Sequence, residues 1–299
     1  MQTFTISDLS FTYPTETAPA LQNVSLSIEA GSFTVLCGKS GCGKSTLIKA
    51  VRQLKPILQP HGTKTGEILF EGKPLDSLTQ REQSARIGFV LQNLDAQLVT
   101  DKVWHELAFG LESLGLDTPT IRRRVAEIAS YFGIQNWFYT PVAELSGGQK
   151  QLVNLASVMA LEPSVLLLDE PTSQLDPIAA TDFLSTLGRI NRELGTTIIL
   201  SEHRLEDALA LSTNVVFMER GCVLDTGTAS EVGARLKAIC FPQCPFRCAS
   251  TRVFRTSFPV LSRSRREGCG WKAFRKRTSF PPFRRPLPQK STRMAPLLN

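Results

Sequence analysis

Residues 38–45, GKSGCGKS, combine glycines with a lysine and a serine at the spacing that phosphate binding requires. The pattern is G-x-x-x-x-G-K-[ST], in which the glycines let the backbone wrap an anion with its N–H groups pointing inward. Lys44 would reach the β- and γ-phosphates of a nucleotide, and the Ser45 hydroxyl would bind Mg²⁺. A flexible glycine turn before a helix is the simpler interpretation. We expect a phosphate-binding loop, and its nucleotide-contacting residues would be Gly38, Lys39, Ser40, Gly41, Cys42, Gly43, Lys44, Ser45 and Thr46.

Two carboxylates, Asp169 and Glu170, follow the apolar run at residues 165–168. Neighbouring residues on a strand point to opposite faces, so the two acids can have different roles. Asp169 would hold Mg²⁺ directly or through water, and Glu170 would orient and polarise an attacking water molecule. A buried strand that ends in two solvated acids is the alternative. Together with the phosphate loop, the pair predicts a site that hydrolyses a nucleotide.

A second glycine-containing segment, LSGGQ, lies at residues 145–149. Ser146 and Gln149 have the spacing of a capping box, which predicts that a helix begins here and runs toward Ala160. A helix N-terminus that includes two glycines, Gly147 and Gly148, is also a site for an anion. Capping and anion binding are compatible, because they use different groups of the same turn.

The elements that would position these residues alternate between short apolar strands and helices, which favours an α/β fold. We expect strands at residues 33–37, 87–91, 165–168 and 197–200, and a helix from about residue 45 to 54. Ile121, Val125, Ile128 and Phe132 share one helical face that Gly133 would end. Asp176 and Pro177 would begin another helix, with an apolar stripe and Gly195 at its end. That stripe consists of Phe183, Leu187, Ile190 and Leu194.

The order of the motifs resembles that of the ABC ATPases, whose signature motif is LSGGQ. In this chain LSGGQ follows the phosphate loop by about a hundred residues and precedes the Asp169–Glu170 pair. The resemblance covers about residues 1–239 and implies a P-loop NTPase cassette. Its RecA-like core would carry an antiparallel β subdomain and an inserted helical subdomain at about residues 93–160. The resemblance also implies a second, identical or different cassette, with ATP bound between one phosphate loop and the partner's signature segment, which here is Ser146, Gly147, Gly148 and Gln149.

Four further positions match the family, each with an alternative explanation. Gln92 lies at the position that senses nucleotide, contacts Mg²⁺ and faces the membrane partner, but it could be a solvated amide at a strand end. His203 matches the switch histidine at the γ-phosphate, whereas a lone histidine is usually a surface or core residue. Tyr13 matches the aromatic that stacks on adenine and could be a plain strand aromatic. Asp176 matches the D-loop, although a helix cap would explain it equally well.

Residues 92–116 resemble a narrower group, the ATPases of energy-coupling-factor (ECF) importers, which import vitamins or transition-metal ions. That resemblance implies a peripheral protein at the cytoplasmic face of the membrane, bound to a transmembrane coupling subunit and a substrate-binding membrane subunit. It does not name the solute. Trp104, Leu107, Phe109 and Leu111 would contact the membrane partner or be ordinary helical core.

The charge of the chain is unevenly distributed. Residues 240–299 hold 14 Lys and Arg residues against one acid, Glu267, whereas the rest holds 20 basic and 26 acidic residues. This tail also contains eight prolines and no sustained period, which predicts disorder. Either the tail is a native extension, or it is translated out of frame in place of a linker and second cassette. Cys240, Cys244, Cys248 and Cys269 do not have a usual zinc spacing, and we expect reduced thiols in a cytosolic protein.

Two other functions compete with transport. The basic tail would suit a soluble ABC-type ATPase acting on nucleic acid, since such tails bind phosphates without sequence preference. Against this, the acidic body has no basic stripe, and no partner nucleic acid is expected. A regulatory cassette that binds ATP without hydrolysis is disfavoured, because Glu170 and His203 are both present. With no apolar run of roughly 18 residues, a membrane role would require a partner.

Overall fold

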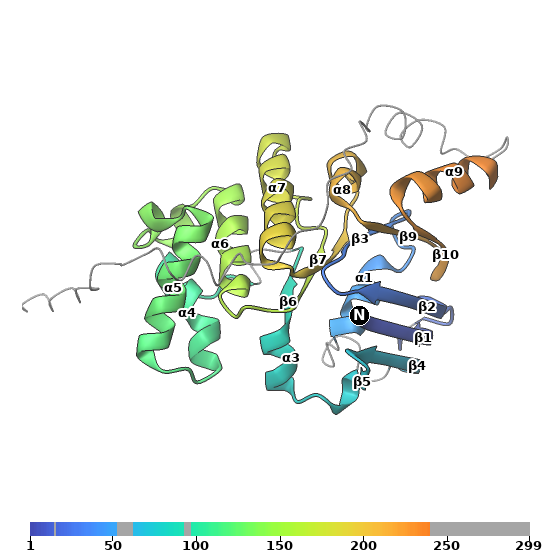
Figure 1. Ribbon diagram of the computed structural model, residues 1–299, viewed down its shortest axis with the longest axis horizontal. Helices are drawn as coiled ribbons and strands as arrows, with labels where there is room; N and C mark the ends of the chain where they lie inside the picture. The colour runs from blue at the N-terminus through green and yellow to red at the C-terminus, as the bar shows by residue number, and fades with distance from the viewer. Residues whose placement is uncertain (15, 53–61, 93–96, 240–299) are drawn as a thin grey trace, which may run out of the picture.

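The computed structural model describes residues 1–14, 16–52, 62–92 and 97–239. These residues form two sheets and a set of helices that are arranged around them (Figure 1). The basic tail and its four cysteines lie outside the described residues. Among the described helices, none is both long and apolar enough to cross a lipid bilayer.

The larger sheet has six strands in the order β10-β9-β3-β8-β7-β6, of which all but β10 run parallel. Every residue of β3, β7 and β8 is buried, as expected for parallel strands that are covered on both faces. The four strands expected from the sequence are confirmed, with ends that differ by at most one residue. The strands are β3 (Phe33–Cys37), β6 (Ile87–Val90), β7 (Val165–Asp169), β8 (Thr197–Ser201), β9 (Asn214–Glu219) and β10 (Cys222–Gly227).

The smaller sheet is antiparallel, with strand order β2-β1-β4-β5, and its inner face packs toward α1 and the larger sheet. In β2, buried and exposed residues largely alternate, which is typical of a sheet with one face on the core. Phe4 and Phe70 face each other across β1 and β4. The strands are β1 (Gln2–Thr12), β2 (Leu21–Glu29), β4 (Thr63–Phe70) and β5 (Lys73–Pro74).

Helices cover the other side of the six-stranded sheet and extend beyond its β6 edge (Figure 1). In chain order, α4 and α5 come between β6 and β7, and they pack with α6 into one group. The α-helices are α1 (Lys44–Arg52), α3 (Gln80–Arg86), α4 (Val103–Ser113), α5 (Thr118–Phe132), α6 (Gly147–Met159), α7 (Pro177–Leu194), α8 (Leu205–Leu211) and α9 (Ala229–Ile239). The 3₁₀ turns are η1 (Leu75–Ser77), η3 (Gln135–Trp137) and η4 (Val142–Glu144).

Four helix ends expected from the sequence are confirmed, whereas the end expected near residue 54 lies outside the described residues. The Ser146 side chain accepts a hydrogen bond from the N–H of Gln149, whose own side chain binds the Ser146 N–H, so both halves of the capping box are present. Asp176 caps α7 by accepting from two backbone N–H groups. Gly133 and Gly195 end α5 and α7 in the left-handed conformation, with φ of 68° and 70°.

Candidate nucleotide site

The phosphate loop joins the carboxyl end of β3 to the start of α1, and its backbone can be built only with glycine at two positions. Gly38 has φ +150°, and a Cβ atom there would lie 2.3 Å from the carbonyl oxygen of Met218. Gly43 has φ +106°, and its Cβ would lie 2.8 Å from the carbonyl oxygen of Ala20. Both positive φ values are costly for other residues. The loop is therefore held tightly against β9 and the segment before β2.

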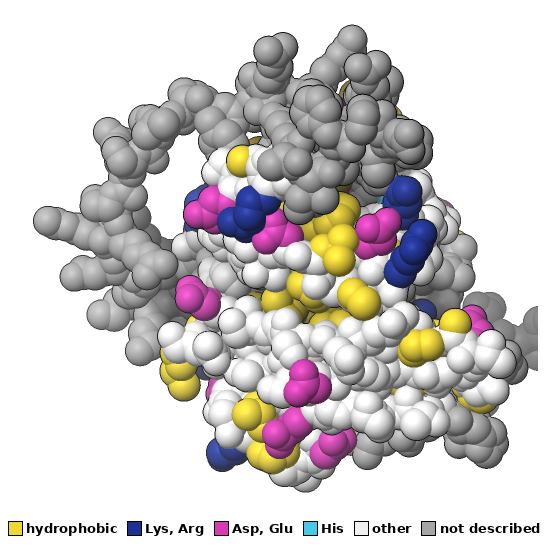
Figure 2. All heavy atoms as spheres, turned by 90° about the vertical axis from the view of Figure 1, so that its right-hand side faces the viewer, with side chains coloured by type: hydrophobic (Ala, Val, Ile, Leu, Met, Phe, Trp, Pro, Cys, Tyr) yellow, Lys and Arg dark blue, Asp and Glu magenta, His cyan; other side chains and the backbone are white. Residues whose placement is uncertain are grey.

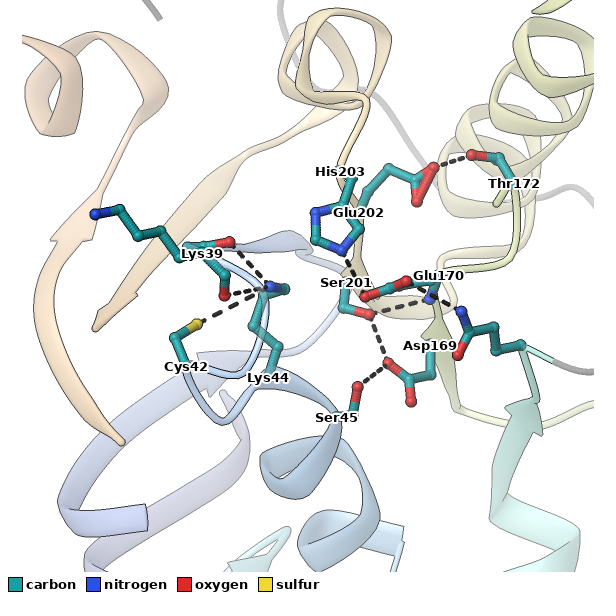
Figure 3. Close-up of polar contacts among 12 residues, drawn as sticks. Lys39, Cys42, Lys44, Ser45, Asp169, Glu170, Thr172, Ser201, Glu202 and His203 are labelled. Atoms are coloured by element: carbon teal, nitrogen blue, oxygen red, sulfur yellow. Dashed lines mark hydrogen bonds and ion pairs between the residues drawn. The ribbon is translucent and has the colours of Figure 1, made fainter. Parts of the chain in front are cut away.

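The Lys44 side chain turns back over the loop, and only 4% of the residue is exposed. Its Nζ donates to the carbonyl oxygens of Gly38 at 2.9 Å and Lys39 at 3.2 Å, and it lies 3.9 Å from the Cys42 Sγ (Figure 3). In this structure carbonyl oxygens accept the hydrogen bonds of the Lys44 ammonium. The oxygens of a bound phosphate would be stronger acceptors, because they are charged. The loop therefore has a buried cation placed for a phosphate group.

Asp169 connects the loop to the end of β7. Its Oδ1 accepts hydrogen bonds from the Ser45 Oγ and from the Ser201 Oγ, each at 2.8 Å. A hydroxyl and a carboxylate are oxygen ligands of the kind that Mg²⁺ prefers, so this pair fits the ion that the sequence predicts. Gln92, the third predicted Mg²⁺ ligand, donates through Nε2 to Glu170 Oε2 at 3.2 Å, and its contact with Mg²⁺ stays a prediction.

Glu170 is the point where three predicted catalytic side chains meet, and Figure 3 labels two of them, Glu170 and His203. Besides the contact with Gln92, its Oε1 lies 2.8 Å from the His203 Nε2. The Glu170 N–H donates to the carbonyl oxygen and to the Oγ of Ser201. Its backbone is left-handed, with φ 47°, a conformation that costs about 1–3 kcal/mol for residues other than glycine. The strained turn directs the carboxylate out of the buried strand toward His203 and Gln92.

Tyr13, expected to stack on adenine, lies beside the first turn of α1. Its hydroxyl is 3.1 Å from the Thr46 Oγ1, and its ring meets Phe11 edge-on at 4.9 Å between centroids. The aromatic is thus adjacent to the helix that follows the phosphate loop. Its adenine contact stays a prediction, as does the D-loop role of Asp176, whose carboxylate caps α7.

The LSGGQ segment lies apart from the phosphate loop, although Gly148 packs against the first turn of α7, where an added Cβ would lie 3.0 Å from the Cβ of Ala179. It begins α6, which belongs to the helical group at the left of Figure 1, whereas α1 lies next to the antiparallel sheet. Ser146 and Gly147 are exposed, and a Cβ added at Gly147 would meet nothing within 4 Å. The helix start is therefore accessible to a group from outside this chain.

Sequence reasoning missed three residues around Glu170, namely Thr172, Ser201 and Glu202. All three are buried, with at most 3% exposed. The Thr172 hydroxyl donates to Glu202 Oε1. Burial, and then the charge of Glu170, raise the pKa of Glu202 to about 7. Ser201 could have been found, because the carboxyl ends of neighbouring parallel strands meet at one edge and Ser201 pairs with Asp169 in register.

Comparison with known proteins decides the family, since a family model described as ABC transporter matches residues 21–173. The chain belongs to the ABC transporter family. An ABC transporter ATP-binding protein of Bacillus cereus is 48% identical over 231 residues, which is 77% of this chain and 41% of the relative. The methionine import ATP-binding protein MetN 2 of Yersinia pestis is 38% identical over 270 residues, covering 87% of this chain and 80% of that one.

Solved structures agree with this assignment. CbiO1 of Clostridium perfringens, part of the ABC transporter complex cbiONQ, is 33% identical with a TM-score of 0.70, covering 80% of this chain and 93% of that one. A dimeric ATP-binding cassette bound to ADP and Pi has a TM-score of 0.64 at 24% identity and shows the shared fold. The predicted ABC ATPase cassette and its P-loop fold are confirmed. The chain spans less than half the length of the first curated relatives that it matches.

Proposed function

We propose that this chain is the ATP-hydrolysing subunit of a membrane importer of the ECF type, working in a pair of cassettes. The observation that carries the proposal is the convergence of Lys44, Asp169, Glu170 and His203 from separate segments onto one edge of the sheet. The cassette would comprise residues 1–239, with its helical subdomain at about residues 93–160, and the tail of 240–299 would be dispensable for hydrolysis.

The residues of the site suit hydrolysis of the γ-phosphate. The phosphates of ATP replace the loop carbonyls as acceptors for the Lys44 ammonium, and Tyr13 stacks on the adenine. Glu170 accepts a proton from water as the water oxygen bonds to the γ-phosphorus, and the bond to the β-phosphate oxygen breaks to leave ADP. His203 donates to a γ-phosphate oxygen. Ser45 and Asp169 would hold Mg²⁺, which neutralises charge on the phosphates.

The exposed start of α6 favours a two-cassette site. Backbone N–H groups at Gly147 and Gly148 begin a helix, whose N-terminal end attracts anions. Because this turn lies apart from the phosphate loop of its own chain, it would act on ATP that is held by a second cassette. Asp176 would lie at the same interface, in the turn before α7.

A transmembrane coupling subunit and a substrate-binding membrane subunit would complete the importer at the cytoplasmic face of the membrane. Two relatives support a role in transport: CbiO1 is part of an ABC transporter complex, and MetN 2 is named for methionine import. In α4, Leu107 and Leu111 are buried core residues, whereas Phe109 is 48% exposed and available for a partner. The solute would be a vitamin or a transition-metal ion.

Two measurements test the proposal. Extraction of the tagged full chain from membranes in mild detergent should co-purify membrane subunits. Glu170→Gln should retain ATP binding but lose about 100-fold or more of turnover, since an amide cannot accept the proton, and it should accumulate an ATP-bound dimer on size exclusion.

Recovery of nucleic acid in place of membrane proteins would refute transport and favour the nucleic-acid ATPase. The one face that Figure 2 shows gives that alternative little support. The face in Figure 2 intersperses acidic with basic side chains and shows no continuous basic stripe among the described residues. Wild-type turnover in Glu170→Gln would separately refute the role of the carboxylate.

A further inference from the structure

Three consecutive residues, the last of β8 and the two that follow it, each bind a different part of the segment from Asp169 to Thr172 (Figure 3). The Ser201 hydroxyl donates to Asp169 and accepts from the Glu170 N–H. The His203 ring lies 2.8 Å from the Glu170 carboxylate. Between them, the Glu202 side chain accepts a hydrogen bond from the Thr172 hydroxyl. The two segments are therefore joined along their length. Ser201 and His203 contact the predicted site residues Asp169 and Glu170, whereas the side chain of Glu202 binds Thr172, which has no predicted role in the site.

Glu202 is almost wholly buried, with 3% of the residue exposed, while His203 next to it is exposed. A buried carboxyl is unfavourable unless it is hydrogen-bonded, and the Thr172 hydroxyl meets that need. Thr172 is itself fully buried, at 0% exposure. Each of the two polar groups thus compensates the burial of the other.

The turn that carries Thr172 is also held from its other side. Gln151 of α6, 1% exposed, donates through Nε2 to the carbonyl oxygen of Pro171 at 2.9 Å. The residues directly after Glu170 are therefore bound both by the helix that begins with LSGGQ and by the segment that carries His203. The two contacts hold the backbone directly after Glu170 from two sides.

We propose that Glu202 is a positioning residue for ATP hydrolysis, and that its hydrogen bond with Thr172 keeps Glu170 and His203 in register. The inference rests on the proposed function, because it assigns Glu202 to the hydrolytic step. Removing the bond leaves Lys44, Ser45 and the phosphate loop in place. Nucleotide binding should therefore persist, while the geometry of the carboxylate and the imidazole is lost.

The test compares both partners of the bond in the full-length chain. Glu202→Ala and Thr172→Val should each lower kcat by about 10- to 100-fold, because small displacements of reacting groups have effects of this size. KM for ATP should stay within about twofold. Glu202→Gln and Thr172→Ser keep an acceptor and a hydroxyl, and each should restore most of the lost kcat. The double variant should be no worse than the poorer single variant, because one interaction is lost only once.

Glu206→Ala is the matched control, an exposed glutamate four residues further on that should leave kcat unchanged. If Glu202→Ala does not fold, the comparison of Thr172→Val with Thr172→Ser decides the question, since only Thr172→Val lacks the hydroxyl that binds Glu202. Three results would each overturn this inference and leave the proposed function standing. The folded variants could keep the wild-type kcat, or Glu202→Gln could be as impaired as Glu202→Ala. A rise in KM could also account for the whole loss of activity. A wild-type chain that hydrolyses no ATP would overturn the proposed function together with it.

Discussion

The buried carboxyl of Glu202 predicts a pH dependence of stability that a single substitution should remove. Its pKa is raised from the ordinary value of 4.5 to about 7, first by burial and then by the Glu170 charge, against the opposing charge of Arg204. A carboxyl with a raised pKa binds its proton more tightly in the folded protein. Its contribution to stability is therefore complete below pH 4.5 and is lost as the pH rises through 7.

The size of the change in stability follows from the difference between the two pKa values. One pKa unit corresponds to about 1.4 kcal/mol, so the difference between 4.5 and about 7 corresponds to about 3 kcal/mol. Glu202→Gln keeps an acceptor for Thr172 but does not titrate. The free energy of unfolding of this variant, minus that of the wild type, should rise by about 3 kcal/mol between pH 4.5 and pH 8.

Urea denaturation of both proteins at several pH values measures this difference, and subtraction removes the titrations that they share. Glu206→Gln is the control, because it makes the same change of side chain at an exposed position. Its difference from the wild type should stay constant with pH. Parallel pH profiles for Glu202→Gln and the wild type would refute the reasoning, because a carboxyl without a raised pKa cannot produce the effect.

Three further predictions concern the nucleotide site. Lys44→Ala should abolish tight binding of a fluorescent ATP analogue, because it removes the cation over the phosphate loop; unchanged affinity would contradict the assignment of the loop. Covalent modification of Cys42, which is 5% exposed, should block ATP binding by bulk, and ATP should protect the thiol in a mass-spectrometric assay. Modification of Cys222, which is more exposed, is the control, and full activity after confirmed labelling of Cys42 would refute the prediction. The specific activity of the isolated chain should rise with its concentration if Ser146 acts, as proposed, on the nucleotide of another cassette; a constant rate from a demonstrated monomer would exclude this.

Motifs formed by neighbouring residues could be predicted from the sequence. The capping box of Ser146 and Gln149 and the cap of Asp176 use hydrogen bonds between residues two or three positions apart. Such bonds depend on the local backbone, so spacing alone predicts them. The phosphate loop is recognisable for the same reason, because Lys44 binds carbonyl groups five and six residues before it.

The periodicity of apolar residues was a weaker guide to which face of a helix is buried, where both faces carry apolar residues. In α4, Leu107 and Leu111 are fully buried core residues, as the plain helical interpretation expected, whereas Phe109 is 48% exposed. Helical spacing puts Leu107 and Leu111 on one face and Phe109 on another, but the sequence could not say which face is core, because an apolar residue is compatible with a core or with a partner surface. Only the packing of α4 against its neighbours decides which face is which.

The sequence by itself therefore determined the family, the phosphate loop and the helix ends. The tertiary structure decided how the site is assembled, since Ser45 meets Asp169 across 124 residues and Gln92 meets Glu170 across 78. Strand order produces these contacts: β3 lies next to β8 and β8 next to β7, which brings Ser45 to Asp169, and β6 pairs with β7, which brings Gln92 to Glu170. The tertiary structure also decided that the Glu202 side chain turns inward to Thr172, whereas the exposed His203 side chain turns to Glu170. Spacing cannot predict that difference, because it depends on which distant turn packs against the end of β8.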